Sequence, residues 1–226
     1  MKPKGKIILR WSPAFAYALG LFATDGNLSP DGRHFDITSK DKEQLENIMK
    51  CLNIRVKIGI KKSGFSGKRI TRIQFGDVRF YEFLLRIGFS ARKSKVIGAL
   101  NIPRRYFFDF LRGHFDGDGT FYSYWDPRWR SSFMFYTVFV SASENHILWI
   151  QKMLQKLLKI HGHITKAKTS SVYQLKYAKK ESLKLLPKLY YTDSVVCLKR
   201  KREKIEKALK NRLYTCAGGE MAYTQP

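Results

Sequence analysis

Two aspartates close two similar apolar stretches of this chain and are the first candidates for chemistry. Asp25 ends "YALGLFATDG" (17–26), and Asp118 ends "FLRGHFDGDG" (110–119). The stretches align without gaps, 93 residues apart, through the pairs Gly20 and Gly113, Phe22 and Phe115, Asp25 and Asp118, and Gly26 and Gly119. A repeat of this length predicts two similar halves of about a hundred residues each.

The position of these acids indicates a cation site. Both stretches are helix-like, and the glycine after each aspartate is expected at the C′ position, where a helix stops. A carboxylate at a helix C-terminus is disfavoured by a few tenths to about 1 kcal/mol, because the helix dipole is negative there. If the two helices pack side by side, two carboxylates and free carbonyls converge, and such hard oxygen ligands suit Mg²⁺. Metal held by paired carboxylates can hydrolyse a phosphodiester.

A calcium loop is the alternative that "DGDG" suggests. An EF-hand that started at Asp116 would need Asp or Asn at its fifth position and Gly at its sixth. The sequence has Thr120 and Phe121 there, and the first copy has Ala23 in place of the first acid. The calcium loop is therefore excluded.

Small residues mark one face of each motif helix. Ala16, Gly20 and Thr24 are spaced by four in the first copy, as are Gly113 and Gly117 in the second. Small side chains let two helix backbones approach closely, which would offset the roughly 1 kcal/mol that a helical glycine costs. We expect Ala16, Gly20 and Gly113 at a helix–helix interface; ordinary core helices with incidental glycines are the alternative.

The elements that follow each motif have the same order, namely two strands, a helix, two strands and a helix. In the first half we expect strands at 34–38, 56–62 and 69–75 and helices at 45–52 and 80–87, with Ser39 as a cap and a polar turn at 27–33. In the second half we expect strands at 133–140, 161–168 and 172–178 and helices at 147–157, 181–189 and 198–213, with Ser143 as a cap. The predicted fold class is α+β, with two pseudo-twofold-related αββαββα halves at residues 1–100 and 101–226.

The charge of the chain points to a nucleic-acid partner. Lys and Arg number 43 against 18 Asp and Glu, which gives +25 at pH 7. The basic residues are spread along a chain that is 44% hydrophobic, so they indicate an extended surface on a folded protein. A membrane surface or a ribosome is the alternative partner.

The three cysteines form no CxxC pair, which fits a reducing, intracellular compartment and leaves cytoplasm and organelle matrix undistinguished. We expect no membrane span and no signal peptide, because no apolar run is long enough and the start of the chain has no apolar core.

Alternation in the strands predicts a sheet face that reads DNA. In "RITRIQF" (69–75), the apolar residues point one way and Arg72 and Gln74 the other. Arg and Lys can pair with guanine and Gln with adenine in the major groove. By the same alternation, the predicted DNA-contacting residues are His34, Asp36, Lys57, Lys61, Arg72, Gln74, Gln174 and Lys176. A solvated sheet face is the alternative. "VFVSA" (138–142) shows no clean alternation, and Trp125 and Trp129 are expected to pack or to contact DNA from a strand-tip loop.

These stretches resemble a known family. "ALGLFATDG" (18–26) and "LRGHFDGDG" (111–119) look like the two copies of the motif of LAGLIDADG homing endonucleases, in the single-chain, two-repeat branch. The resemblance covers nearly the whole chain. It implies a monomer whose motif helices pack at the interface of the halves, with antiparallel sheets that form a DNA-binding saddle. It also implies hydrolysis of both strands of a long asymmetric DNA target, with two or three divalent ions, Mg²⁺ by preference and Mn²⁺ or Ca²⁺ as structural substitutes.

The resemblance also implies roles for single residues. Asp25 and Asp118 stand where the family has its metal-binding acids, and the carbonyls of Thr24 and Gly117 would be further metal ligands. Departures from the motif are Ala23, where an acid such as Asp116 is common, and His114, where apolar residues are usual. The basic residues that support catalysis would be Lys93 and Lys199, with Lys95 and Lys201 as near rivals. Ser39 stands where some members have a water-contacting glutamine.

Two other functions stay open for such a scaffold. One is an intron RNA maturase, so intron RNA is an alternative partner. The other is a DNA-binding protein without cleavage. The acids retained in both motif copies favour cleavage.

Overall fold

The computed structural model describes residues 5–62, 67, 69–91, 95–129, 132–166 and 172–216, with backbone alone for 211–216. Lys93, the hairpin connections at 63–66 and 167–171, and the last ten residues lie outside the described residues. The elements of the first half are α1 (Pro13–Asp25), β1 (Gly26–Leu28), β2 (His34–Ser39), α2 (Lys42–Leu52), β3 (Gly59–Lys62), β4 (Arg69–Gly76) and α3 (Val78–Arg86). Those of the second are η2 (Arg104–Tyr106), α4 (Phe107–Gly117), β5 (Thr120–Trp125), β6 (Phe133–Ser141), α5 (Glu144–Leu158), β7 (His163–Lys166), β8 (Tyr173–Ala178), α6 (Lys179–Leu189) and α7 (Lys199–Cys216).

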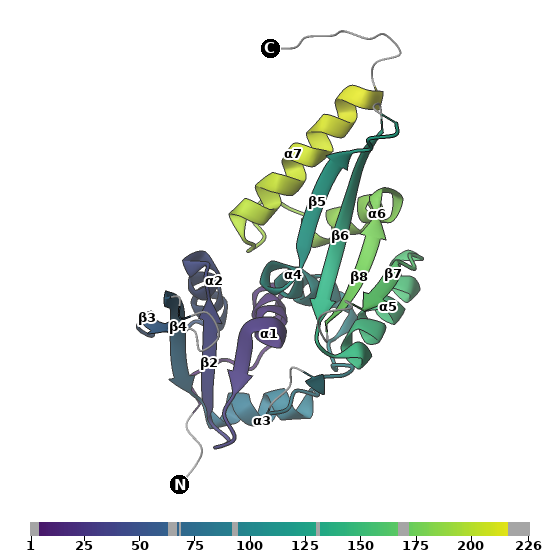
Figure 1. Cartoon of the computed structure of the whole chain (residues 1–226). Helices are drawn as coiled ribbons and strands as arrows, with labels where there is room; N and C mark the ends of the chain where they lie inside the picture. Colours follow the sequence, from purple (N-terminus) through teal and green to yellow (C-terminus); the bar gives the residue numbers. More distant parts are fainter. Residues whose placement is uncertain are drawn as a thin grey trace.

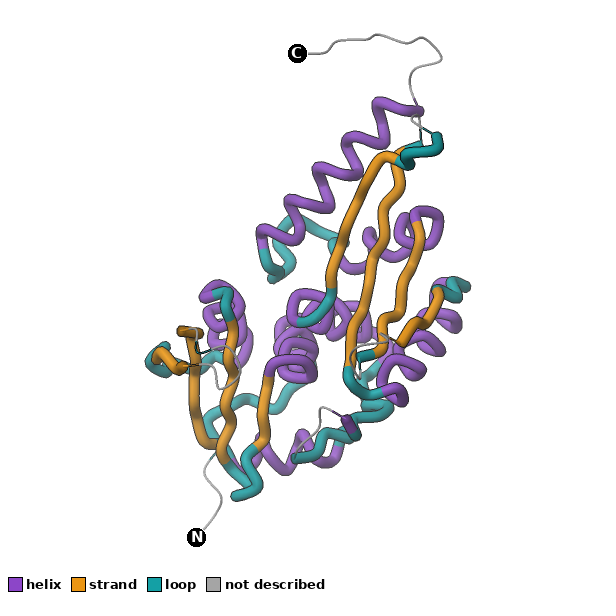
Figure 2. Tube along the Cα trace, in the orientation of Figure 1, coloured by secondary structure: helices purple, strands orange, loops and turns teal. Residues whose placement is uncertain are grey.

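The strands form two antiparallel four-stranded sheets with the same topology. The strand order is β1-β2-β4-β3 in one sheet and β5-β6-β8-β7 in the other. Figure 1 shows the sheets on either side of α1 and α4, and Figure 2 shows the same alternation of helix and strand in each half. The α+β, two-repeat fold class is confirmed.

The central helices α1 and α4 touch through their backbones. A Cβ atom on Gly20 would lie 2.0 Å from the carbonyl oxygen of Phe110 in α4. A Cβ atom on Gly113 would lie 2.0 Å from the carbonyl oxygen of Tyr17 in α1. Ala16, the other small residue of this face, is fully buried. Both glycines therefore occupy positions where any side chain would force the helices apart.

The glycines after the two aspartates have another role than the one expected. Gly26 has φ −79° and ψ 144°, so α1 passes directly into β1 and not into a left-handed C′ residue. A Cβ atom there would meet the Phe22 ring at 2.5 Å, and one on Gly119 would meet Phe115 at 2.6 Å. Close packing against the preceding helical turn, and not backbone conformation, explains both glycines.

Other local expectations also need correction. Asp41, and not Ser39, is the N-cap residue of α2, because Ser39 still belongs to β2. The polar turn predicted at 27–33 begins with β1, which extends to Leu28. The strand predicted at 56–62 begins only at Gly59. Ile60, which alternates with the DNA-contact candidate Lys61, is 68% exposed because β3 is an edge strand.

Each sheet covers its own aromatic core. In the first, Phe22, Phe35 and Phe80 pack edge to face or tilted against one another at 5.2–6.1 Å. In the second, Phe139 packs on Phe115 and Tyr177. On the opposite face of the first sheet, Asp36 and Gln74 alternate with this core and are partly or fully exposed. Among the described residues, no helix is long and apolar enough to cross a bilayer.

Candidate active site

The C-terminal ends of α1 and α4 meet where the two aspartates lie. A Cβ atom on Gly117 would lie 1.9 Å from Oγ1 of Thr24 and 2.8 Å from Oδ2 of Asp25. Asp118 follows as the C-cap residue of α4. The Asp25 carboxylate therefore lies against the backbone that carries Asp118, and both acids sit at the negative ends of their helices.

Asp25 is held by an amide from α2. Gln44 Nε2 donates to Oδ2 of Asp25 at 2.5 Å, and Oγ1 of Thr24 donates to the same oxygen at 3.0 Å. Ser39 Oγ in turn donates to Oε1 of Gln44 at 2.8 Å, which fixes the amide with its NH₂ group toward the acid. Gln44 is buried. Gln44 was not predicted as a site residue; only Ser39 was considered for the role of a water-contacting glutamine.

A lysine from the second half closes the end of α4. Lys201 Nζ shares its three protons among the carbonyl oxygens of Phe115, Asp116, Gly117 and Gly119, which lie 2.6, 2.8, 3.2 and 2.7 Å away. Burial lowers the pKa of Lys201 to about 8, against the opposing effect of Asp116 and the two motif aspartates. The ammonium thus offsets the negative helix end.

The other candidate lysines lie elsewhere. Lys199 is exposed at the start of α7, where its backbone N–H donates to Oε1 of Glu43 at 3.4 Å. Lys95 is also exposed, and Lys93 lies outside the described residues. Of the two lysines weighed for the second half, the structure brings Lys201, and not Lys199, to the motif helix.

Asp116 is buried and accepts hydrogen bonds from residues of both halves. Tyr17 Oη donates to its Oδ2 at 2.8 Å, and the backbone N–H of Leu198 donates to the same oxygen at 2.7 Å. The carboxylate is fully buried, and burial raises the pKa of Asp116 to about 6. It ties α1 to α4 and to the start of α7, which explains why only one motif copy has an acid here.

Asp116→Asn is expected to stabilise the protein at neutral pH. Because the folded-state pKa of Asp116 is raised above its usual 3.8, the folded state binds the proton more tightly, and stability falls as pH rises from about 4 through about 6. The amide keeps an acceptor for Tyr17 and Leu198, so the variant should gain about 3 kcal/mol at pH 7 and nothing at pH 3.5. Urea denaturation at both pH values measures this. An equal effect at the two pH values would contradict the assignment.

The surroundings of Asp118 differ from those of Asp25. His146 holds the third position of α5, as Gln44 does in α2, but its ring stacks on His114 at 5.2 Å. A cavity of about 80 Å³ is lined by Ala23, Thr24, Ile97, His114, Asp118, Val140, Ser141 and Ala142. It is large enough for water beside Asp118.

The donor set at the helix ends fits a hard cation. Magnesium is usually bound by one or two carboxylates and completes its shell with water and substrate phosphate. Asp25 and Asp118 supply two carboxylates, and no cluster of three His, Cys, Asp or Glu side chains occurs among the described residues. The carbonyl oxygen of Gly117, a predicted metal ligand, already accepts a hydrogen bond from Lys201. The two carboxylates are therefore the main groups that could bind a metal here.

The open face of the first sheet gathers polar side chains. Strand register sets Asn27 opposite Asp36 and Asp36 opposite Gln74, with Arg72 in the next row opposite Thr38. Arg72 Nε lies 3.1 Å and Lys61 Nζ 3.7 Å from the Asp36 carboxylate. Lys57, by contrast, precedes β3 and is exposed outside the sheet.

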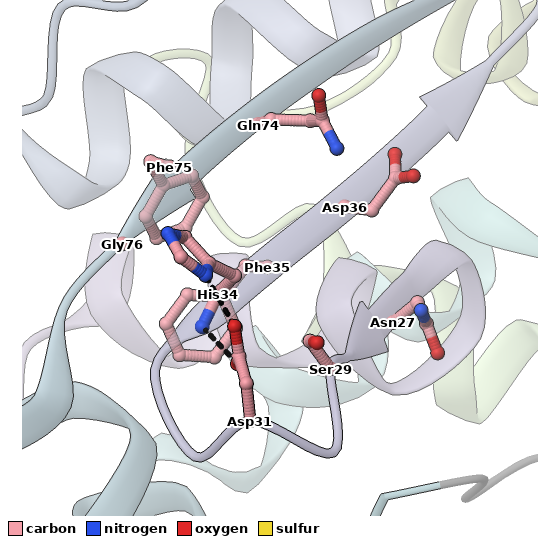
Figure 3. Close-up of a pocket in the computed structure, with 9 residues that line it drawn as sticks. All are labelled: Asn27, Ser29, Asp31, His34, Phe35, Asp36, Gln74, Phe75 and Gly76. Atoms are coloured by element: carbon pink, nitrogen blue, oxygen red, sulfur yellow. Dashed lines mark hydrogen bonds and ion pairs between the residues drawn. The ribbon is translucent and has the colours of Figure 1, made fainter.

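A pocket of about 630 Å³ lies on this face (Figure 3), lined by Asn27, Ser29, Asp31, His34, Phe35, Asp36, Gln74, Phe75 and Gly76. Oδ2 of Asp31 pairs with Nδ1 of His34, and this hydrogen bond lowers the pKa of Asp31. Three of the nine lining residues, His34, Asp36 and Gln74, were predicted to contact DNA.

The open face of the second sheet is less polar. Gln174 lies opposite Val140 and Thr165, and Lys176 lies opposite Val138 and His163. The clean alternation was missing from "VFVSA" because Val138 and Val140, the residues of β6 opposite Lys176 and Gln174, are aliphatic, and Val138 is buried.

The fold, the repeat and the paired acids define a two-repeat protein of the LAGLIDADG type. The model of the WhiA LAGLIDADG-like domain matches residues 14–94 and 108–210. The chain therefore belongs to the family of WhiA LAGLIDADG-like domains. The resemblance found in the sequence named the homing endonucleases, which share the fold.

Solved structures agree on that fold. Full-length DUF199/WhiA from Thermatoga maritima superimposes with TM-score 0.56 at 19% identity; the match covers 91% of this chain and 63% of that one. The homing endonuclease I-WcaI bound to its DNA recognition sequence gives TM-score 0.60 at 13% identity, over 86% of each chain. A variant of I-DmoI in complex with its target DNA in the presence of 2 mM Mg gives TM-score 0.50 at 16% identity, over 80% of this chain and 97% of that one. No curated protein matches this chain in sequence.

Proposed function

We propose that this protein is a Mg²⁺-dependent, site-specific endonuclease that cuts double-stranded DNA as a monomer. The observation that carries the proposal is the contact between the two helix ends, where Oδ2 of Asp25 lies within 2.8 Å of a Cβ position on Gly117. Two carboxylates at the centre of a strongly basic protein are suited to a metal and a phosphodiester, and to little else.

The site residues divide the work as follows. Asp25 and Asp118 would hold the metal, which when bound supplies an activated water and stabilises the leaving oxygen. Gln44 orients the Asp25 carboxylate through its amide. Lys201 offsets the negative end of α4, which reduces the repulsion between that helix end and a DNA phosphate.

A DNA-binding protein without cleavage is the second candidate. Its support is the family match itself, which is named for WhiA and not for an endonuclease. The Lys201 contact adds to it, because an ammonium on the carbonyl of Gly117 competes with a metal there. Intact Asp25, Asp118 and Gln44 favour the endonuclease.

The experiment that separates the two candidates is selection from a randomised duplex library. The protein is incubated with the library in Mg²⁺, and cut and bound molecules are sequenced separately. The endonuclease predicts recovery of one long asymmetric site, cut in Mg²⁺ and intact in EDTA. Recovery of a bound site that is never cut, with Mg²⁺ or Mn²⁺, would establish the second candidate and overturn the first.

A further inference from the structure

The second sheet is longer than the first at the end far from the aspartates. β5 runs from Thr120 to Trp125 and pairs with β6 along its whole length, whereas the equivalent β1 has three residues. Figure 1 shows this hairpin extending away from α1 and α4, alongside α7. The extra length adds a surface that the first half does not have.

Three tyrosines occupy the open face of this extension. Tyr122 lies directly opposite Tyr136, and Tyr124 lies opposite Met134. Tyr122 and Tyr124 alternate along β5 with the buried Phe121. Val138, two residues after Tyr136 on β6, lies opposite Lys176 of β8, so Lys176 is on the same face of the sheet as the tyrosines. We call Tyr122, Tyr124 and Tyr136 the tyrosine cluster.

The rings of the cluster are nearly parallel and packed on one another. Tyr122 and Tyr136 have centroids 5.2 Å apart with 17° between ring planes; Tyr124 and Tyr136 are 6.3 Å apart with 4°. Tyr122 and Tyr124 remain 36% and 41% exposed. A base-stacking platform needs an open ring face, whereas stacked rings present mainly apolar edges and hydroxyl groups.

The hydroxyls of Tyr122 and Tyr124 stay protonated at neutral pH. Burial raises the pKa of Tyr122, and a hydrogen bond with Tyr136 raises that of Tyr124. The surface thus offers apolar edges with neutral donors and no anion of its own. In the first sheet the residues that correspond to Tyr122 and Tyr136 are Ser29 and His34, which are both polar. The backbone N–H of Ser29 donates to the carbonyl oxygen of His34.

The surroundings favour nucleic acid over an apolar protein partner. The whole chain carries +25, and Lys176 stands on the same face. Arg128 at the hairpin tip has an 81% exposed side chain, which pairs with Asp126. The face also continues that of Gln174, which the register places two residues further along β8.

We propose that the tyrosine cluster selects thymine in the outer part of the DNA half-site that the second half contacts, by packing ring edges against the 5-methyl groups in the major groove. Thymine alone presents a methyl group there. The first half reads its half-site with charged and amide groups, so the two halves use different chemistry. This inference rests on the DNA binding of the proposed function and not on cleavage.

Deoxyuridine tests the inference directly, because it keeps every hydrogen bond of thymine and lacks only the methyl group. A duplex from the bound fraction of the library is synthesised with each thymine replaced in turn. We expect one or two replacements at the outer end of one half-site to weaken binding about fourfold each, the contribution of one methyl group. In the double variant Tyr122→Thr with Tyr124→Thr, thymine and deoxyuridine should bind equally at those positions.

The matched control is Tyr136→Phe, which removes a hydroxyl and keeps the ring, and so should keep the preference for thymine. Threonine is chosen because it is a good strand former, and circular dichroism checks the fold of each variant. A specific site without thymine at that end, or a deoxyuridine effect that survives the double variant, overturns the inference. If the site is cut but deoxyuridine has no effect on binding, the inference about thymine is wrong and the endonuclease proposal stands. If deoxyuridine weakens binding but the site is never cut, the inference stands and only the endonuclease proposal is wrong.

Discussion

Substitution of either Asp25 or Asp118 by asparagine is expected to abolish double-strand cleavage. Asparagine keeps the shape of the side chain and removes its charge, so the proposed cation would lose one of its two carboxylate ligands. Because a bound metal stabilises the transition state by several kcal/mol, we expect the rate of double-strand cutting to fall by at least about 10³-fold. Affinity for the duplex should stay within about threefold, since DNA binding depends mainly on phosphate contacts by Lys and Arg.

The measurement is a plasmid assay that separates nicked from linear product, together with a binding titration in Ca²⁺. Asp193→Asn is the matched control: it makes the same chemical change at a fully exposed side chain that pairs only with Arg202 among the contacts described. Linear product formed at the wild-type rate by either motif variant would refute the assignment of the acids. If the control lost activity as well, charge alone would explain the effect.

The sequence was informative where a physical constraint was repeated. Gly20 and Gly113 could be paired, and Asp25 could be placed beside Asp118, because both motif copies carry the same small and acidic residues at the same spacing. The apolar and polar alternation of β4 likewise placed Arg72 and Gln74 on the open face, where the register puts them.

Residues that occur in one half only could not be placed from the sequence. Lys199 and Lys201 lie two positions apart on α7, which is about 200° around a helix, so one points at the site and the other away. The choice depends on how the helix is anchored, and that anchor is the bond from Leu198 N to Asp116. Gln44 could not be predicted for a similar reason, because its position depends on where α2 begins. It reaches Asp25 because the N-cap residue of α2 is Asp41 and not Ser39.

Alanine at Gly113 is expected to have the largest effect on stability. The added Cβ would lie 2.0 Å from the carbonyl oxygen of Tyr17 and 3.0 Å from the backbone nitrogen of Leu21. Both neighbours are backbone atoms of α1, so no rotamer change relieves the clash, and the helices must separate. Overpacking at a backbone contact should lower the free energy of unfolding by about 3–5 kcal/mol.

Gly98→Ala is the matched control, because a Cβ atom there would meet no atom within 4 Å and its φ is not positive. It should change the free energy of unfolding by less than about 0.5 kcal/mol, as measured by urea denaturation of both variants at pH 7. The same separation of α1 from α4 would pull Asp25 from the Gly117 backbone, so the folded fraction of Gly113→Ala should also cut DNA more slowly than its concentration predicts. Wild-type stability in this variant would mean that the two helices do not touch at Gly113, and the meeting of the two acids would lose its structural basis.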